Sequence, residues 1–314
     1  MTGSLPFGIA LWVAAAAAGG DRSEQVAAAR AFAGVDPQQA LTQVESLRRQ
    51  AVAEGDLASQ LGADEVACRV WSDLDTERAL AVASAGVAAV SDPSGPAREA
   101  WLRLRACLAE MQIEVGEVTQ GLDELEELLS LSSGAETRAL ALVVRGAYRS
   151  RSGALEAGQA DLLEACEALR VARTPDRELC LGHLAGHYRR VGDGQEALRL
   201  QRRLLDDAHA RGATYDESIH AFAVAQSLQQ LERWAESLDV LRAASASSER
   251  LGDQVGVSFA EHDTAVGLLR MDRPVEALAH VERSLALLDP GVDPYQTVNA
   301  TITLAQALAG VGRA

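Results

Sequence analysis

The sequence contains no lysine and few aromatic residues. All 29 of its basic residues are arginines, against 45 Asp and Glu, so the formal net charge is −16. An acidic surface repels phosphate groups, and we therefore expect neither nucleic acid nor lipid as a partner. Only 4% of the 314 residues are aromatic, whereas 48% are hydrophobic. The packed interior must therefore consist mainly of Ala, Leu and Val.

Cysteine motifs are missing too. The four cysteines, Cys68, Cys107, Cys166 and Cys180, form no CxxC pair, and this spacing excludes a zinc ribbon or a thioredoxin-type motif. In a chain of this length, scattered cysteines behave as small core residues. We expect that role here, and a disulfide framework is the alternative.

Long apolar runs are absent with one exception, the uncharged run Leu5–Ala18. It is shorter than the roughly 20 residues that span a membrane. Its small residues resemble the end of a secretory signal, but no cation precedes it, the first being Arg22. We assign residues 1–25 to an N-terminal segment that is either a signal peptide or a packing helix. We expect a cytoplasmic protein, or an exported one if this run is a signal.

What the chain does contain is a period of about forty residues. Ala185, Ala225, Ala265 and Ala305 stand forty residues apart, each followed three residues later by Tyr or Leu. Looser copies precede them at spacings of about 36 to 42 residues. Such regularity is typical of a repeat architecture, here with about seven and a half copies over residues 26–314.

Each copy predicts two helices. Leu278, Val281, Leu285 and Leu288 follow the spacing of one helix face in the second half of a copy. The prolines fall between helices or between copies and interrupt no predicted helix, so the sequence predicts an all-α fold. The last copy has a predicted first helix at about 298–310 but no second one, and we expect the array to continue beyond residue 314.

The segments VGDGQEAL, LERWAESL and MDRPVEAL resemble the tetratricopeptide repeat (TPR). The period is longer than the usual thirty-four residues, which implies longer helices. The resemblance covers nearly the whole chain. It implies a right-handed superhelical solenoid of helix-turn-helix repeats, in which the first helices line a concave groove. In such a groove a peptide or protein partner lies.

Two histidines four residues apart, His183 and His187, suggest a metal site on one helix face. However, the corresponding positions in later copies hold Ala, Ser, Asp and Gly, and no HExxH pattern supplies a third ligand. A thiol nucleophile formed by Cys180 and His183 lacks an orienting third group. Arg199, Arg202 and Arg203 are better explained by pairing with neighbouring acids than by phosphate binding. We therefore predict no catalytic residue, no metal and no cofactor, and hence no enzyme.

By the same resemblance, the residues that would face the groove lie near the small residue of each copy. The candidates are His183, Gly186, Arg190, Gln226, Gln230, His262, Asp263 and Arg270. Their arginines could hold a carboxylate through two hydrogen bonds. The Lys and Asn residues of the known carboxylate-clamp pattern are not matched.

A narrower resemblance concerns the long-repeat sensory regions that precede bacterial diguanylate cyclase (GGDEF) domains. ELCLGHLAGHYRRVGDGQEALRL and RPVEALAHVERSLALLD carry it. It implies a regulatory or dimerising module that controls an output domain beyond residue 314. A homodimer is a further association that we expect from it. The alternative is a free-standing adaptor that binds peptide segments in its groove.

Overall fold

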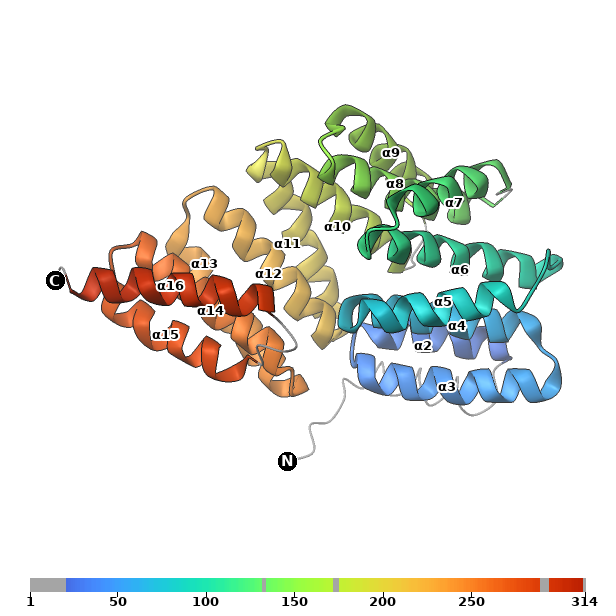
Figure 1. The fold of residues 1–314 in the computed structure, drawn as a ribbon, viewed down its shortest axis with the longest axis horizontal. Coiled ribbons are helices and arrows are strands. Elements are labelled where there is room, and N and C mark those ends of the chain that lie inside the picture. Colours follow the sequence, from blue (N-terminus) through green and yellow to red (C-terminus); the bar gives the residue numbers. More distant parts are fainter. Residues whose placement is uncertain (1–20, 132–133, 172–174, 289–293, 313–314) are drawn as a thin grey trace. The chain divides into compact units, whose positions relative to one another are not determined.

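The computed structural model describes residues 21–131, 134–171, 175–288 and 294–312. Within these ranges the chain forms fifteen α-helices and no strand. Their bounds are α2 (Arg22–Ala33), α3 (Pro37–Glu54), α4 (Leu57–Leu74), α5 (Thr76–Ala88), α6 (Gly95–Glu114), α7 (Val118–Leu131), α8 (Ala135–Arg151), α9 (Leu155–Ala168), α10 (Pro175–Arg190), α11 (Gly194–Arg211), α12 (Thr214–Gln230), α13 (Trp234–Leu251), α14 (Gln254–Arg270), α15 (Pro274–Leu287) and α16 (Pro294–Val311). The predicted all-α fold is confirmed (Figure 1).

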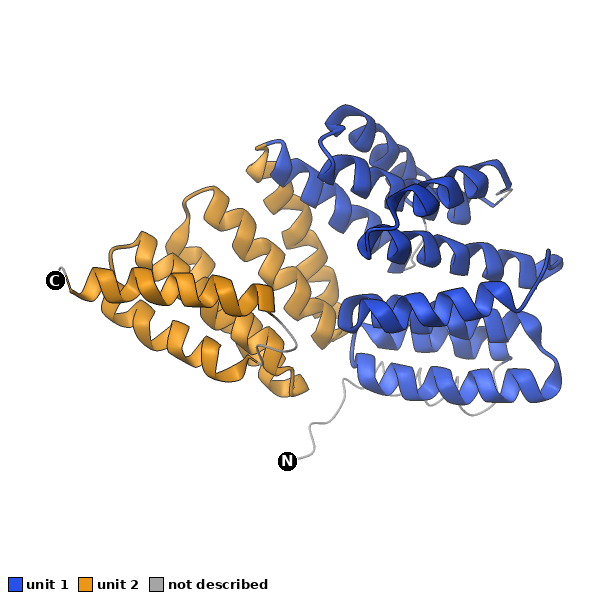
Figure 2. Ribbon diagram, in the orientation of Figure 1, with its two compact units in different colours: residues 1–191 blue, residues 192–314 orange. Residues whose placement is uncertain are grey.

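In chain order the described helices follow one another as seven and a half copies of two helices each, and six of these copies show contacts between their two helices: α2/α3, α4/α5, α6/α7, α8/α9, α12/α13 and α14/α15. This succession matches the predicted seven and a half copies. The chain divides into two compact units, residues 1–191 and 192–314 (Figure 2). The handedness of the superhelix, and a single continuous array over residues 26–314, stay predictions.

Local sequence explains where the helices begin and turn. The side chains of Asp36, Asp56 and Asp253 each accept a hydrogen bond from a backbone N–H in the first turn of the helix that follows. In the turn between α10 and α11 the chain enters the left-handed region at Gly192, with φ of 86°. Forty and eighty residues later Glu232 and Asp272 hold φ at 58° and 57°. The repeat therefore keeps its turn even where glycine is replaced, at a cost of about 1 kcal/mol.

In the first unit, the first helices of successive pairs contact one another: α2 with α4, α4 with α6, α6 with α8 and α8 with α10. We call α2, α4, α6, α8 and α10 the first-helix layer of unit 1. The second helices α3, α5, α7 and α9 each pack against the first helices before and after them. Side chains on this layer therefore come from repeats that are far apart in sequence.

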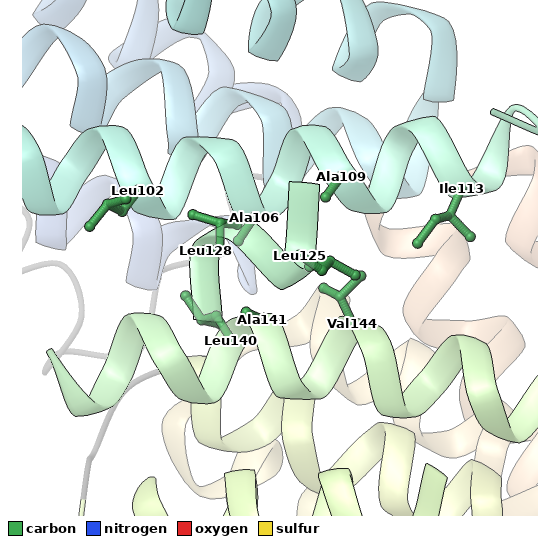
Figure 3. Packing of buried hydrophobic residues seen from close by; sticks show 9 residues of the cluster. All are labelled: Leu102, Ala106, Ala109, Ile113, Leu125, Leu128, Leu140, Ala141 and Val144. Carbon is green, nitrogen blue, oxygen red and sulfur yellow. The ribbon is translucent and has the colours of Figure 1, made fainter. Parts of the chain in front are cut away.

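Small and aliphatic residues fill the space between these helices. In Figure 3, α6, α7 and α8 contribute the side chains of one such cluster, and all of its members are buried. They are Leu102, Ala106, Ala109, Ile113, Leu125, Leu128, Leu140, Ala141 and Val144. In an aromatic-poor chain, alanine lets the helices approach and leucine fills the remaining volume.

The second unit shows the same packing at the positions that repeat. Ala225 and Ala265 on the first helices, and Ala277 on α15, are fully buried. Ser237 on α13 is also buried, and its hydroxyl donates to the carbonyl of Ala225. The helices of this unit therefore approach closely at the small residues of the repeat.

The structure corrects the interpretation of the cysteines. Cys68 on α4 is joined to Cys107 on α6, and Cys166 on α9 to Cys180 on α10. Cys68, Cys107 and Cys180 are fully buried, so their core position was predicted, but the preference against a disulfide framework was wrong. Residues 39 and 14 apart in sequence meet because neighbouring helices pack at Cα separations of 6.5 and 5.6 Å.

The run Leu5–Ala18 lies outside the described residues, and both interpretations of it stay predictions. None of the described helices combines the length and apolar character that crossing a membrane requires.

We predict that the two disulfides stabilise the first unit unequally. Closing loops of 39 and 14 residues contributes about 4 and 3 kcal/mol in the chain-entropy model. The double variant Cys68→Ala/Cys107→Ala should therefore lose more free energy of unfolding than Cys166→Ala/Cys180→Ala, as measured by urea titration with circular dichroism.

Dithiothreitol should lower the unfolding midpoint of the wild type and leave a variant lacking all four cysteines unchanged. If the wild type unfolds at the same urea concentration with and without the reductant, the disulfides do not contribute as predicted.

Candidate functional site

A network of buried charges crosses the first-helix layer of unit 1. Arg103 on α6 donates two hydrogen bonds to Asp176 on α10, at 2.8 and 3.0 Å, and lies 3.4 Å from Glu65 on α4. Glu65 also pairs with Arg30 on α2. Arg103, Glu65 and Asp176 are all less than 10% exposed. These ion pairs tie four first helices together.

Glu65 is held in its charged form. Burial alone would raise the pKa of Glu65, but the positive charges of Arg30, Arg103 and Arg69 lower it to about 2. Removing the negative charge would leave buried guanidinium groups without compensation. This part of the network is therefore structural, because each of its charges is already matched.

A second group of charges on the same layer is not matched in this way. Arg69 on α4 pairs with Glu110 on α6, and Arg151 at the end of α8 pairs with Glu114. Arg190, at the end of α10, makes no ion pair in the described part of the chain. It folds back along its own helix, so that a Cβ added at Gly186 would lie 3.4 Å from its Nη1 atom.

His183 lies within the field of these charges. Burial lowers the pKa of His183; the charge of Glu110 opposes this effect, and those of Arg151, Arg69 and Arg190 add to it. The Nε2 atom of His183 is buried and has no hydrogen-bond partner among the described residues. The imidazole is therefore a neutral group with an unused polar atom, next to several guanidinium groups.

We call Arg69, Arg151, His183 and Arg190 the basic cluster. Burial lowers the pKa of Arg190, and the neighbouring charge of Arg151 lowers it further. A lowered pKa means that the surroundings disfavour the positive charge. Arg69 pairs with Glu110 and Glu65 and Arg151 with Glu114, whereas Arg190 has no ion pair among the described residues and keeps an unbalanced charge, in a chain whose net charge is −16. An anion placed at the cluster would relieve this imbalance.

His187 has a different role from His183. It is 1% exposed, and its Nδ1 atom lies 2.9 Å from the hydroxyl oxygen of Ser150 on α8. The two histidines therefore do not act as a pair. Although later copies vary at this position, His187 is packed core. No group of three or more metal-ligating side chains occurs in the described ranges.

Of the eight groove candidates, three lie together on α10: His183, Gly186 and Arg190. The other five lie on α12 and α14 of the second unit. There His262 contacts Asp263 at 3.2 Å and the hydroxyl group of Thr303 on α16 at 3.1 Å. Gln226 and Gln230 also have interaction partners, and Arg270 is exposed. The structure thus places all eight on first helices, and their role in binding stays a prediction.

The sequence did not reveal Arg69 and Arg151, which belong to other repeats than His183. No periodic signal marks them, because only packing across the first-helix layer brings α4, α8 and α10 to one place.

The other group of arginines, on α11, pairs with neighbouring acids, as the sequence predicted. Arg199 pairs with Glu196, Arg202 lies 3.4 Å from Glu236, and Arg203 lies 3.9 Å from Asp207. These arginines line a shallow hollow on α11 and are offset by acids.

No protein-family model and no curated protein matches the chain. Solved helical-repeat structures do. The chain is similar to a Rap protein complexed with competence and sporulation factor, with 14% identity, a TM-score of 0.61, and coverage of 82% of this chain and 72% of that one. For yeast Tom70 the identity is 13%, the TM-score 0.54 and the coverage 98% and 67%.

A third similar structure is a signal-transduction ATPase from Pyrococcus horikoshii that carries a tetratricopeptide-repeat sensor. Its identity is 13%, its TM-score 0.52, and the match covers 87% of this chain but 44% of that one. Identities this low establish the fold alone. The chain has a TPR-like helical-repeat fold, of the kind that other proteins use for interaction with protein partners.

We predict that Glu65→Gln destabilises the protein by about 3 kcal/mol at pH 7, because it leaves buried arginines unpaired. The pKa of Glu65 is lowered from 4.5 to about 2, so its stabilising contribution is complete above pH 4.5 and is lost as the pH falls towards 2. Urea titrations of wild type and variant at pH 7, 4, 3 and 2 should therefore converge at the acidic end.

The matched control is Asp239→Asn, whose partner Arg242 lies 2.9 Å away, with both side chains 75% exposed. It should change the free energy of unfolding by less than about 0.5 kcal/mol. A difference between wild type and Glu65→Gln that stays constant from pH 7 to pH 2 would contradict the assignment of a lowered pKa.

Proposed function

We propose that this chain is a non-catalytic binding module for a protein or peptide partner, and that the partner contributes a carboxylate to the basic cluster. The observation that carries this proposal is the unmatched positive charge on the first-helix layer of unit 1. Arg190 has no ion pair among the described residues, and the buried Nε2 atom of His183 has no partner. A carboxylate, from an acidic side chain or a chain terminus, supplies both a negative charge and hydrogen-bond acceptors.

The arrangement of the cluster favours a polypeptide over a small free anion. Its members come from α4, α8 and α10, so the cluster spans several repeats of one layer. A solenoid layer presents an extended surface on which a polypeptide can contact successive repeats. The similar Rap structure is complexed with competence and sporulation factor, which supports the same use of the fold here.

Two contexts for such a module fit the chain. In the first, which we favour, the module is a sensory or dimerising region that regulates an output domain of the diguanylate cyclase kind. The similarity to an ATPase with a tetratricopeptide-repeat sensor supports it. In the second, the module is a free-standing adaptor that holds its partner alone. The two differ in whether partner binding changes the activity of a linked domain.

We further propose that the chain works in an oxidising compartment. All four cysteines are joined in disulfides, and each bond links two helices of the first unit. Structural disulfides persist in secreted and periplasmic proteins and are rare in the cytosol. This favours the exported alternative for the chain over the cytoplasmic one.

The binding proposal is tested with an array of peptides synthesised both with a free and with an amidated C-terminus. We expect the wild type to retain peptides that carry Asp, Glu or a free terminal carboxylate. Arg190→Glu should weaken their retention at least tenfold, because a charge-assisted hydrogen bond is lost and a repulsion is added.

The control for this experiment is Arg170→Glu. Arg170 follows α9 and has a side chain that is 66% exposed, so its reversal changes the net charge equally but away from the cluster. Equal retention by Arg190→Glu and Arg170→Glu, or retention that ignores the carboxylates, would refute the proposal.

The compartment is tested by trapping thiols. Chain taken from its native cells is denatured in N-ethylmaleimide, and its mass is then measured. We expect no adduct before reduction and four adducts after it, one for each cysteine of the sequence. Four adducts without reduction would place the protein in a reducing compartment.

A further inference from the structure

His183 on α10 holds a buried polar atom that nothing in the described part of the chain uses. The residue is half-buried, and its Nε2 atom is buried without a hydrogen-bond partner among the described residues. Arg69 on α4 donates to Glu110 through Nη1, while its Nε and Nη2 atoms are also buried and make no hydrogen bond within these residues. Buried polar atoms without partners are rare because each costs free energy, and a bound ligand would supply the missing partners.

The charges that act most strongly on His183 come from four first helices. Glu110 on α6 contributes a negative charge, and Arg69 on α4, Arg151 on α8 and Arg190 on α10 itself contribute positive charges. Burial lowers the pKa of His183; Glu110 opposes this effect, and the three arginines add to it. The imidazole is therefore neutral at pH 7, in a place where positive charge prevails.

The other groups on α10 and on its neighbour α9 are already accounted for. His187, one turn further along α10, is core and contacts the hydroxyl group of Ser150; burial lowers its pKa, and so does the charge of Arg190. Helix α9 also packs against α10 and is joined to it by a disulfide, which does not titrate. No charge of α9 is among those that act most strongly on His183.

A carboxylate bound at the basic cluster would change the protonation of His183. Its negative charge beside the imidazole would raise the pKa of that group, because the charged form gains an ion pair and a hydrogen bond from Nε2–H. A proton from the solvent then binds to the ring, so that both ring nitrogens carry a hydrogen. The arginines of the cluster stay charged at every pH near neutrality, so His183 is the member that responds to pH.

We propose that His183 takes up a proton when a carboxylate binds at the basic cluster, so that the partner binds more strongly at mildly acidic pH than at neutral pH. This inference rests on the proposed function, because it concerns the regulation of the same site. A group whose pKa is higher in the complex binds more protons there, and the affinity therefore rises as the pH falls through that pKa. Below about pH 4 the carboxylate of the partner itself becomes neutral, and the gain is lost.

Isothermal titration calorimetry of the full 314-residue chain tests the inference. The probe is the carboxylate-bearing peptide that the wild type retains most strongly in the array, and the same peptide with its carboxylates converted to amides is the control. We expect the affinity for the probe to rise at least about threefold from pH 7.5 to pH 5.5, since a one-unit rise in pKa allows up to tenfold. The pKa of Glu65 is about 2, so the buried network keeps its charges over this range.

Proton uptake is measured directly by titrations at pH 6.5 in two buffers that differ in their enthalpy of ionisation. The observed heat of binding should differ between the buffers for the wild type, because the buffer supplies the proton. His183→Gln keeps a hydrogen-bond donor but cannot be protonated, so its binding should depend neither on the buffer nor on pH. The matched control His209→Gln, on α11 with a side chain that is 83% exposed, should behave like the wild type.

The wild type decides the outcome even if His183→Gln does not fold. Carboxylate-dependent binding that is equally strong at pH 7.5 and 5.5, with the same heat in both buffers, overturns this inference and leaves the proposed function in place. A pH dependence that His183→Gln retains in full assigns the proton to another group, such as His187, and overturns it too. If retention in the array ignores carboxylates, the proposed function fails, and this inference fails with it.

Discussion

A pair of amphipathic helices cannot bury its apolar surface alone, and every other feature of this protein depends on that constraint. Each pair is stable only because the next pair covers it, so the fold requires close approach at the same position of every copy. Small residues such as Ala185, Ala225 and Ala265 permit this approach, and each of them is at most 1% exposed. Helix α16 shows the reverse case. It has the same small residue at Ala305 but no second helix among the described residues, and its face stays exposed.

Stacking also decides where charge can accumulate. Because first helices contact first helices, residues from α2, α4, α6 and α10 meet in one network around Glu65 and Arg103. That network is balanced and serves stability. In the neighbouring basic cluster Arg190 has no ion pair among the described residues, and it lies near the half-buried His183, whose Nε2 atom is buried. The balanced network therefore has a structural role, and the proposed binding role belongs to the unbalanced cluster on the same layer.

The sequence predicted the all-α fold and the number of copies, because these depend on local spacing. It placed His183, Gly186 and Arg190 on a first helix, also from the period. It could not find Arg69 and Arg151, since contacts between helices about 40 to 120 residues apart leave no local signal. The cysteines show the same limit: their burial followed from composition, but their pairing required knowledge of which helices are neighbours.

Periodicity and composition by themselves determined that this chain is a helical repeat with an alanine- and leucine-rich core and an acidic surface. Those properties follow from the helical repeat of 3.6 residues per turn and from the difference between polar side chains, which stay in water, and apolar ones, which are buried. Only the tertiary structure decided which charges are paired, which histidine is core and which cysteines are bonded. The physical reason is that these properties depend on distances between helices, and the packing of whole repeats sets those distances.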